Sequence, residues 1–550
     1  MQSLVESGHL TGARGAYRLT TAVGALEVPA SVQGVLAARI DRLPEREKQV
    51  LQTAAVIGKT FSEVLLGRVV ASVATIGEAE LSASLSALVA AEFLYEAALY
   101  PQLEYSFKHP LTQEVAERSQ LRERRMRVHA AVAQALEEAG GNLDERAAEL
   151  AHHYEAAGDA AAAARWHRRA AQWAGLSDLR EGLRHWRRVR ELAPGGEDVR
   201  ERTELTLQAC LQLLALGWRM GGSEAEAAAV YEEGRALTER AGDRRALAML
   251  VGTYGLVRAN IGGSALDYVR YGEEGARIAA ECGDPALRAA LGVFPAYGHL
   301  NAGDGRAVLE WSARVLEEVG PDNMLGKEIL GVSPRVAAFT IRALALTFLG
   351  QLEEAWSQVR GAEREAEESR ELEVLGWVKM AWALLAYTCG GSESVLEHGR
   401  RSHEIAEKLD NESSRVLAYF GLGIAYLIDA QPAAAREALR ESAAIARDRR
   451  TVRAFLSHVL AVLAEAHLAL GERTEALATA REAIDLGSAG GCRYFEAHAQ
   501  LALAGGLLAT DGVVPRAEIE SALERAERLV ERIEGRARSG IVRLFLGCTA

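Results

Sequence analysis

The sequence Ala461-Val-Leu-Ala-Glu-Ala-His-Leu-Ala-Leu-Gly471, followed closely by Thr474-Glu-Ala-Leu-Ala-Thr-Ala-Arg-Glu-Ala-Ile484, indicates the architecture of most of this chain. Both stretches have the apolar spacing of a helix, and a short turn separates them. Small residues at the expected crossing points allow the two helices to approach closely: Ala464, Gly471, Ala476, Ala480 and Ala483. One such pair cannot bury its own apolar face, whereas a stack of pairs can.

The same helix pair recurs from about residue 145 to the end. Helices are expected to end near residues spaced 41, 48 and then four times 40 apart, namely Ile261, Ala302, Gly350, Gly390, Ala430, Leu470 and Thr510. Such a period is typical of solenoids of stacked helix pairs. The pattern resembles tetratricopeptide repeats, although their usual period is about 34 residues. We expect a mainly α protein in which residues 141–550 form a tetratricopeptide-like α-solenoid.

Composition narrows the class of protein. A chain of 550 residues is too long for one hydrophobic core, and 49% hydrophobic with 25% charged residues is ordinary for a globular protein. The five cysteines lie far apart without a C-x-x-C, which argues against a disulfide framework and favours a reducing compartment. The N-terminus lacks the apolar core of a signal peptide, and the most apolar stretch, residues 501–509, is about half a membrane span. We therefore expect a cytoplasmic protein that does not bind membranes.

Residues 28–140 lack the repeat pattern and have a different order of predicted elements. Helical patterns over residues 32–40, 44–57, 62–70 and 77–90 precede two short alternating segments, residues 93–95 and 103–107. Three helices followed by a hairpin predict a winged-helix module. Residues 1–27 are rich in glycine and are expected to be the tail of a missing N-terminal domain.

No catalytic constellation can be argued from residue spacing. Two stretches, Gly58-Lys59-Thr60 and residues 320–328, imitate a phosphate-binding loop, but neither follows a buried strand, which such a loop needs. The pairs His152-His153 and His398…His403 could suggest a metal, yet residues at these spacings on a helix are expected to diverge. Isolated Trp residues such as Trp377 are expected in the solenoid core or groove. We expect no active site and no metal site.

Nucleic-acid binding is not expected either. Arginines cluster in residues 118–127 and 165–190, but in a chain of net charge −13 they are simply interpreted as solvated helix faces paired with acidic neighbours. The helix in the recognition position, residues 77–90, contains Glu78 and Glu80 and no Lys or Arg. Such a surface would repel phosphates, so we do not expect this chain to bind DNA.

Four stretches carry a resemblance to a known family: residues 28–43, VPASVQGVLAARIDRL; 54–58, AAVIG; 105–116, YSFKHPLTQEVA; and 151–159, AHHYEAAGD. They resemble the region after the NTPase domain in bacterial STAND signalling ATPases, which are AAA-type proteins with tetratricopeptide-like arrays. Relatives carry an adenylate/guanylate cyclase or a DNA-binding effector. The sequence resemblance covers about residues 1–175. The remainder of the chain resembles the family only in its helical-repeat architecture. Walker A, Walker B and cyclase motifs are absent from this sequence, so the resemblance implies a C-terminal part lacking the P-loop. It also implies that residues 1–27 are the tail of a missing N-terminal NTPase domain and that residues 28–140 are a winged-helix coupling module.

The resemblance implies a non-catalytic sensor of signal transduction. The solenoid groove would bind a protein partner or a small inducer, and the winged helix would couple it to an NTPase domain in cis or trans. That domain would hold ATP or ADP with Mg²⁺, and this chain itself would bind no cofactor. Residues 107–111, FKHPL, are similar to a segment whose His contacts the nucleotide phosphates, which makes His109 the candidate nucleotide-state sensor. The alternative for His109 is a cap on the following helix. The alternative function is a stand-alone protein–protein interaction scaffold, and oligomerisation stays open.

Overall fold

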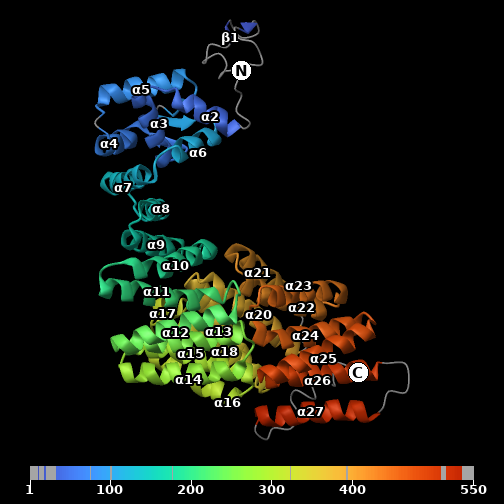
Figure 1. Cartoon of the computed structure of the whole chain (residues 1–550). Coiled ribbons are helices and arrows are strands. Elements are labelled where there is room, and N and C mark those ends of the chain that lie inside the picture. Colours follow the sequence, from blue (N-terminus) through green and yellow to red (C-terminus); the bar gives the residue numbers. More distant parts are fainter. Residues whose placement is uncertain are drawn as a thin grey trace. The chain divides into compact units, whose positions relative to one another are not determined.

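The computed structural model describes residues 10–11, 18–19, 32–74, 76–98, 102–175, 177–322, 324–389, 391, 394–509 and 516–534 (Figure 1). The predicted domain tail, residues 1–27, lies outside these ranges except for the paired strands β1 (Leu10–Thr11) and β2 (Arg18–Leu19). The chain divides into two units, each with a hydrophobic core. The first holds Met1–Trp173 and Glu191–Arg202, and the second holds Ala174–Arg190 and Thr203–Ala550.

The first unit contains a three-stranded antiparallel sheet of order β3-β5-β4. Its elements are α2 (Val32–Asp41), α3 (Glu45–Ile57), β3 (Thr60–Ser62), α4 (Glu63–Val73), α5 (Glu78–Ala90), β4 (Leu94–Ala98), β5 (Glu104–Phe107) and α6 (Pro110–Arg118). The expected order of helices and hairpin is present, and β3 adds a strand too short to be indicated by the sequence. Phe61 on β3 stacks on Tyr105 of β5, which buries the sheet face. The assignment as a winged helix rests on this element order and stays a prediction.

Three further helices pack onto the same core: α7 (Arg122–Ala139), α8 (Ala147–Ala157) and α9 (Ala160–Ala174). Leu150, Tyr154 and Trp166 bury apolar surface against it. The Tyr154 hydroxyl and the Trp166 Nε1–H both donate to Glu137 Oε1, each at 2.9 Å. These contacts carry the first unit beyond residue 140, where the module was expected to end.

The remainder of the described chain is helical. Its elements are α10 (Leu179–Leu192), η2 (Ala193–Gly195), α11 (Val199–Gly217), α12 (Glu224–Ala241), α13 (Arg244–Asn260), α14 (Ala265–Cys282), α15 (Pro285–Ala302), α16 (Gly305–Val319), α17 (Lys327–Leu330), α18 (Pro334–Phe348), α19 (Leu352–Glu368), α20 (Leu372–Cys389), α21 (Val395–Leu409), α22 (Glu412–Ile428), α23 (Pro432–Asp448), α24 (Arg453–Ala469), α25 (Arg473–Gly490), α26 (Arg493–Leu508) and α27 (Arg516–Glu534). The repeat helices α13, α15, α18, α20, α22, α24 and α26 end within two residues of the predicted positions. The longer 48-residue spacing corresponds to the repeat that also contains the short helix α17.

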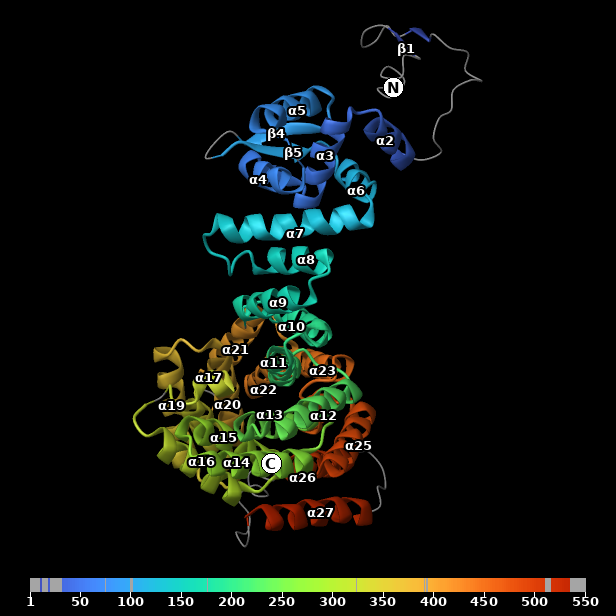
Figure 2. The same ribbon diagram turned by 60° about the vertical axis from the view of Figure 1, so that its left-hand side comes forward.

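The second unit is a tetratricopeptide-like α-solenoid. Consecutive helices pack in pairs, and every first helix of a pair also packs on the first helix of the next pair: α13, α15, α18, α20, α22, α24 and α26 form this inner layer. The inner layer turns back on itself, because α13 contacts α24 and α15 contacts α26 (Figures 1 and 2). Helices far apart in the sequence therefore share one interior.

Small residues lie at the helix crossings, as predicted from the quoted repeat. Ala464, Ala476, Ala480 and Ala483 are all buried. The expectation for Gly471 is wrong: it is exposed, has φ +76°, and ends the helix in the turn instead of lying at a crossing. Its left-handed backbone, which glycine adopts without steric cost, explains why glycine stands there.

Among the described residues, one helix is long and apolar enough to cross a membrane, α20. Because 67% of that helix is buried within the protein, it is explained as a core helix of the solenoid.

Candidate ligand-binding site

The inner helices of the solenoid line a cavity of about 160 Å³. Its wall is mostly apolar and comes mainly from the inner helices α13, α15, α18, α20, α22, α24 and α26. Its side chains include Leu256, Val293, Phe294, Leu344, Phe348, Met380, Leu384, Phe455 and Phe495. An apolar cavity of roughly 150 Å³ is known to accept a single benzene ring. The cavity therefore has room for a small ring or a short aliphatic group.

The segment after α11 ties the first helices of the solenoid to the later ones. Thr451 Oγ1 donates to the Trp218 carbonyl at 2.7 Å, and the Ser413 N–H donates to the Arg219 carbonyl at 2.9 Å. At Gly221 the backbone has φ +77°, and a Cβ would lie 1.7 Å from a carbonyl oxygen of the α23–α24 connection. Only glycine fits this approach without a shift of the backbone.

A buried ion pair lies in the same region. Arg219 Nε donates to Glu373 Oε1 at 2.7 Å and Arg219 Nη2 to Glu373 Oε2 at 3.1 Å, while the two side chains are only 5% and 7% exposed. Arg219 Nη1 donates to the Ala215 carbonyl at 2.7 Å, and the guanidinium lies 4.7 Å from the Trp218 ring centroid. This two-pronged geometry is the strong form of the Arg–carboxylate interaction. It places a neutralised cation in the cavity wall.

Three residues of the cavity wall have polar atoms without a hydrogen-bond partner among the described residues. They are Trp218 Nε1, Tyr268 Oη and Trp377 Nε1, all buried. Burial raises the pKa of Tyr268 well above its ordinary value, so the phenol keeps its proton and can donate. A buried donor left unpaired costs about 1–3 kcal/mol. A ligand with an apolar body and a hydrogen-bond acceptor would complement this wall.

His109 lies outside the solenoid, at the N-cap position of α6. Its side chain is exposed and makes no hydrogen bond to the first turn of α6, so the side chain does not cap this helix. The neighbouring Lys108 pairs with Glu92 at 3.3 Å. His109 is thus accessible to another molecule, and its contact with a nucleotide stays a prediction.

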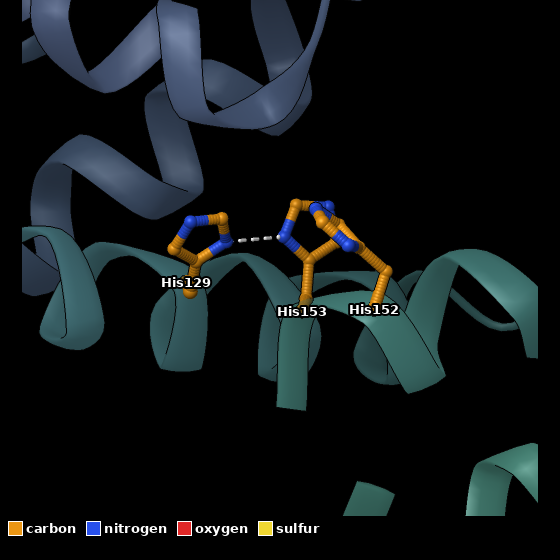
Figure 3. Close-up of side chains that lie close together, drawn as sticks. All are labelled: His129, His152 and His153. Carbon is orange, nitrogen blue, oxygen red and sulfur yellow. Dashed lines mark hydrogen bonds between the residues drawn. The ribbon is translucent and has the colours of Figure 1, made fainter. Parts of the chain in front are cut away.

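The expectation that His152 and His153 diverge is wrong. Figure 3 shows both rings close to His129 of the neighbouring helix α7, and one nitrogen from each of the three rings lies within 4.8 Å of the others. His152 and His153 point in different directions from the α8 backbone, but rotation of each side chain about its two bonds brings the two rings together. His129 lies on another helix, so the spacing of residues along α8 could not have indicated it. The other pair does separate, since His398 stacks on Trp382 and His403 packs on Tyr419.

Arginines of the basic stretch 165–190 pair with acidic side chains, as interpreted from the sequence, and in the stretch 118–127 Arg118 pairs with Glu114 at 3.1 Å. The pairs include Arg165 with Glu201 at 3.2 Å, Arg187 with Glu226 at 3.4 Å and Arg190 with Glu233 at 2.6 Å. On α5, Glu80 pairs with Arg46 at 3.1 Å. These charges are engaged within the protein.

No protein-family model and no curated protein matches this chain. Several solved structures match over most of its length. A Rap protein complexed with competence and sporulation factor has 12% identity and a TM-score of 0.48, over 69% of this chain and 98% of that one. The STAND protein PH0952 with a tetratricopeptide repeat sensor, from Pyrococcus horikoshii, has 11% identity and a TM-score of 0.38, over 94% and 68%. Yeast Tom70 has 13% identity and a TM-score of 0.30, over 78% and 96%. Similarity at these identities and TM-scores does not indicate a function.

Sequence reasoning found part of the cavity wall. Trp377, expected in the core or groove, does line the cavity. Arg219 and Glu373 were missed because 154 residues separate them. One signal was present: Glu373 and Lys379 are the charged residues of the otherwise apolar helix α20. A buried carboxylate requires a cationic partner, so the position of Glu373 on an apolar helix could have indicated a pairing with a distant arginine.

Proposed function

We propose that this chain is the non-catalytic sensor part of a STAND-type signalling ATPase, and that its solenoid binds a small ligand with an apolar body and a hydrogen-bond acceptor. The observation that carries the proposal is the cavity of about 160 Å³ whose wall holds three unpaired polar groups. A scaffold that uses only its outer surface has no need of such an interior.

Ligand binding would act through closure of the solenoid. The wall combines early helices, such as α13 and α15, with late ones, such as α24 and α26. A ligand that contacts both groups binds the closed form more tightly than an open one and shifts the population toward closure. Coupling to the nucleotide state would involve the module of residues 32–118, with the exposed His109 as the contact to nucleotide.

The ligand chemistry is tested with two molecules of nearly equal shape, acetophenone and ethylbenzene. Acetophenone has a carbonyl acceptor that ethylbenzene lacks. Binding is measured on the full chain by calorimetry and by quenching of tryptophan fluorescence, since Trp218 and Trp377 line the cavity. We expect acetophenone to bind about tenfold more tightly, because its carbonyl pairs one otherwise unpaired donor.

Two matched variants locate the binding. Leu256→Trp fills the cavity from α13, whereas Leu508→Trp adds the same side chain at a position that is 64% exposed. We expect Leu256→Trp to abolish binding and Leu508→Trp to leave it unchanged. Equal binding by both variants, or the same affinity for both molecules, would contradict the proposed ligand class.

The switch is tested separately with an NTPase domain supplied in trans, taken from the coding sequence upstream if one is found there. The proposal predicts that binding of that domain differs between ADP, ATP and no nucleotide, and that His109→Ala weakens this difference while His299→Ala does not. The scaffold alternative predicts partner binding that is indifferent to nucleotide.

A further inference from the structure

Three histidines from two adjacent helices of the first unit meet at one point. His129 comes from α7, and His152 and His153 come from α8 (Figure 3). His129 Nδ1 and His153 Nδ1 are 2.9 Å apart, and the centroid of the His152 ring lies 5.7 Å from that of His129 and 5.3 Å from that of His153. Three imidazoles are a common donor set for divalent transition metals.

The two inner histidines are almost completely buried. His129 is 3% exposed and His153 is 2% exposed. A metal ligates through the unprotonated nitrogen of a neutral imidazole. In the hydrogen bond of 2.9 Å between the two rings, one Nδ1 carries the proton and the other accepts it. Ligation of a metal through both Nδ1 atoms requires the donor ring to change to its other tautomer, with the proton on Nε2.

A carboxylate stands behind His129. Glu117 Oε1, at the end of α6, lies 4.0 Å from His129 Nε2. In metal sites, the ligating histidine usually directs its other ring N–H toward a carboxylate, which fixes the ring and raises its basicity. If His129 ligates through Nδ1, its Nε2–H faces Glu117. At 4.0 Å the two groups are not hydrogen-bonded, and a small rotation of Glu117 would make it the outer partner of the cluster.

We propose that His129, His152 and His153 form a binding site for Zn²⁺, with water as the fourth ligand. Zinc–nitrogen bonds of about 2.0–2.1 Å in a tetrahedron place the nitrogens about 3.3 Å apart. The observed 2.9 Å contact and the 4.8 Å limit for the whole set bracket that value, so small side-chain rotations complete the geometry. His152 is exposed, which gives the ion a path from solvent. Bound metal would join α7 to α8 through side chains.

The first test measures zinc binding to the full chain after chelator treatment, by competition with a chromophoric chelator. We expect one tight equivalent. His152→Ala removes an exposed donor, so the variant should fold and yet bind that equivalent at least about tenfold more weakly. The matched control is His299→Ala, in α15 beside Glu273, which should bind as the unchanged chain does. Glu117→Gln should weaken binding by about tenfold, because the outer partner loses its charge.

The second measurement identifies the geometry. Co²⁺ in a tetrahedral site absorbs visible light strongly, and this absorption should appear with the unchanged chain and with His299→Ala but not with His152→Ala. The proposal is overturned if the unchanged chain binds no stoichiometric Zn²⁺, or if His152→Ala binds it equally well and gives the same Co²⁺ spectrum.

Discussion

Removing one partner of the ion pair between Arg219 and Glu373 should destabilise the solenoid strongly. Both side chains are more than nine-tenths buried, and two hydrogen bonds of 2.7 and 3.1 Å join them. Arg219→Met keeps the aliphatic stem and leaves the Glu373 carboxylate without its cation. Breaking a buried pair in this way costs about 3–5 kcal/mol.

The size of the solenoid converts this energy into a measurable shift. With an unfolding entropy of about 2.1 cal/mol/K per residue, a loss of about 4 kcal/mol in a unit of this length lowers Tm by about 5 °C. Differential scanning calorimetry of the full chain measures Tm for Arg219→Met, for Glu373→Met and for the double variant. The Tm of the double variant should be close to that of the unchanged chain, because replacing both charges by apolar groups leaves no unpaired charge in the interior.

The control is the exposed pair of Arg187 with Glu226, whose side chains are 52% and 53% exposed. Arg187→Met should change Tm by less than about 1 °C, since exposed pairs contribute little. The reasoning is refuted if Arg219→Met behaves like Arg187→Met. It is equally refuted if the double variant loses the sum of the two single losses, because the two charges would then not be coupled.

Two further perturbations give effects of known direction. Gly221→Ala should cost about 3 kcal/mol by chemical denaturation, because a left-handed backbone and a contact with a carbonyl oxygen add together, whereas Gly471→Ala, with the same φ and nothing within 4 Å, should cost about 1 kcal/mol. Equal costs would show that the approach at Gly221 is not tight. The pKa values of His129, His153 and His458 are lowered by burial, so the unfolded chain binds protons below about pH 6.5 that the folded chain does not. The contribution of these groups to the free energy of unfolding should be constant above that pH and should fall below it, by up to about 1.4 kcal/mol per pH unit for each group. His458→Leu removes one of the three groups, so its Tm should fall less than that of the unchanged chain between pH 7.5 and pH 5.5.

The repeat architecture could be predicted from the sequence because its signals are local. Turn residues and apolar spacing recur every 40 residues or so, and they placed the ends of seven inner helices within two residues. The error at Gly471 is of the same kind, since a glycine suits a crossing and a turn equally well, and only the backbone conformation separates the two roles.

The candidate sites could not be predicted because they depend on non-local contacts. Arg219 meets Glu373 across half of the solenoid, and Thr451 meets Trp218 across 233 residues of chain. The histidine cluster joins residues only 24 positions apart, yet it depends on how α7 packs against α8. Helix spacing specifies which residues share a face of one helix, and it contains no information about which face a second helix presents.

The ties that close the solenoid and the wall of its cavity share residues, and this links binding to conformation. Trp218 accepts the hydrogen bond from Thr451 through its backbone and lines the cavity with its side chain. Arg219 lines the cavity too, and its partner Glu373 belongs to α20, which contributes three further wall residues. A ligand that pairs with the unpaired donors in this wall is stabilised only while these residues hold their positions. Weakening the closure by Arg219→Met should therefore lower the affinity for acetophenone, although the guanidinium is already engaged with Glu373. An unchanged affinity in a variant with a lowered Tm would mean that the cavity is formed by local repeats alone, and that a ligand within it could not report on closure.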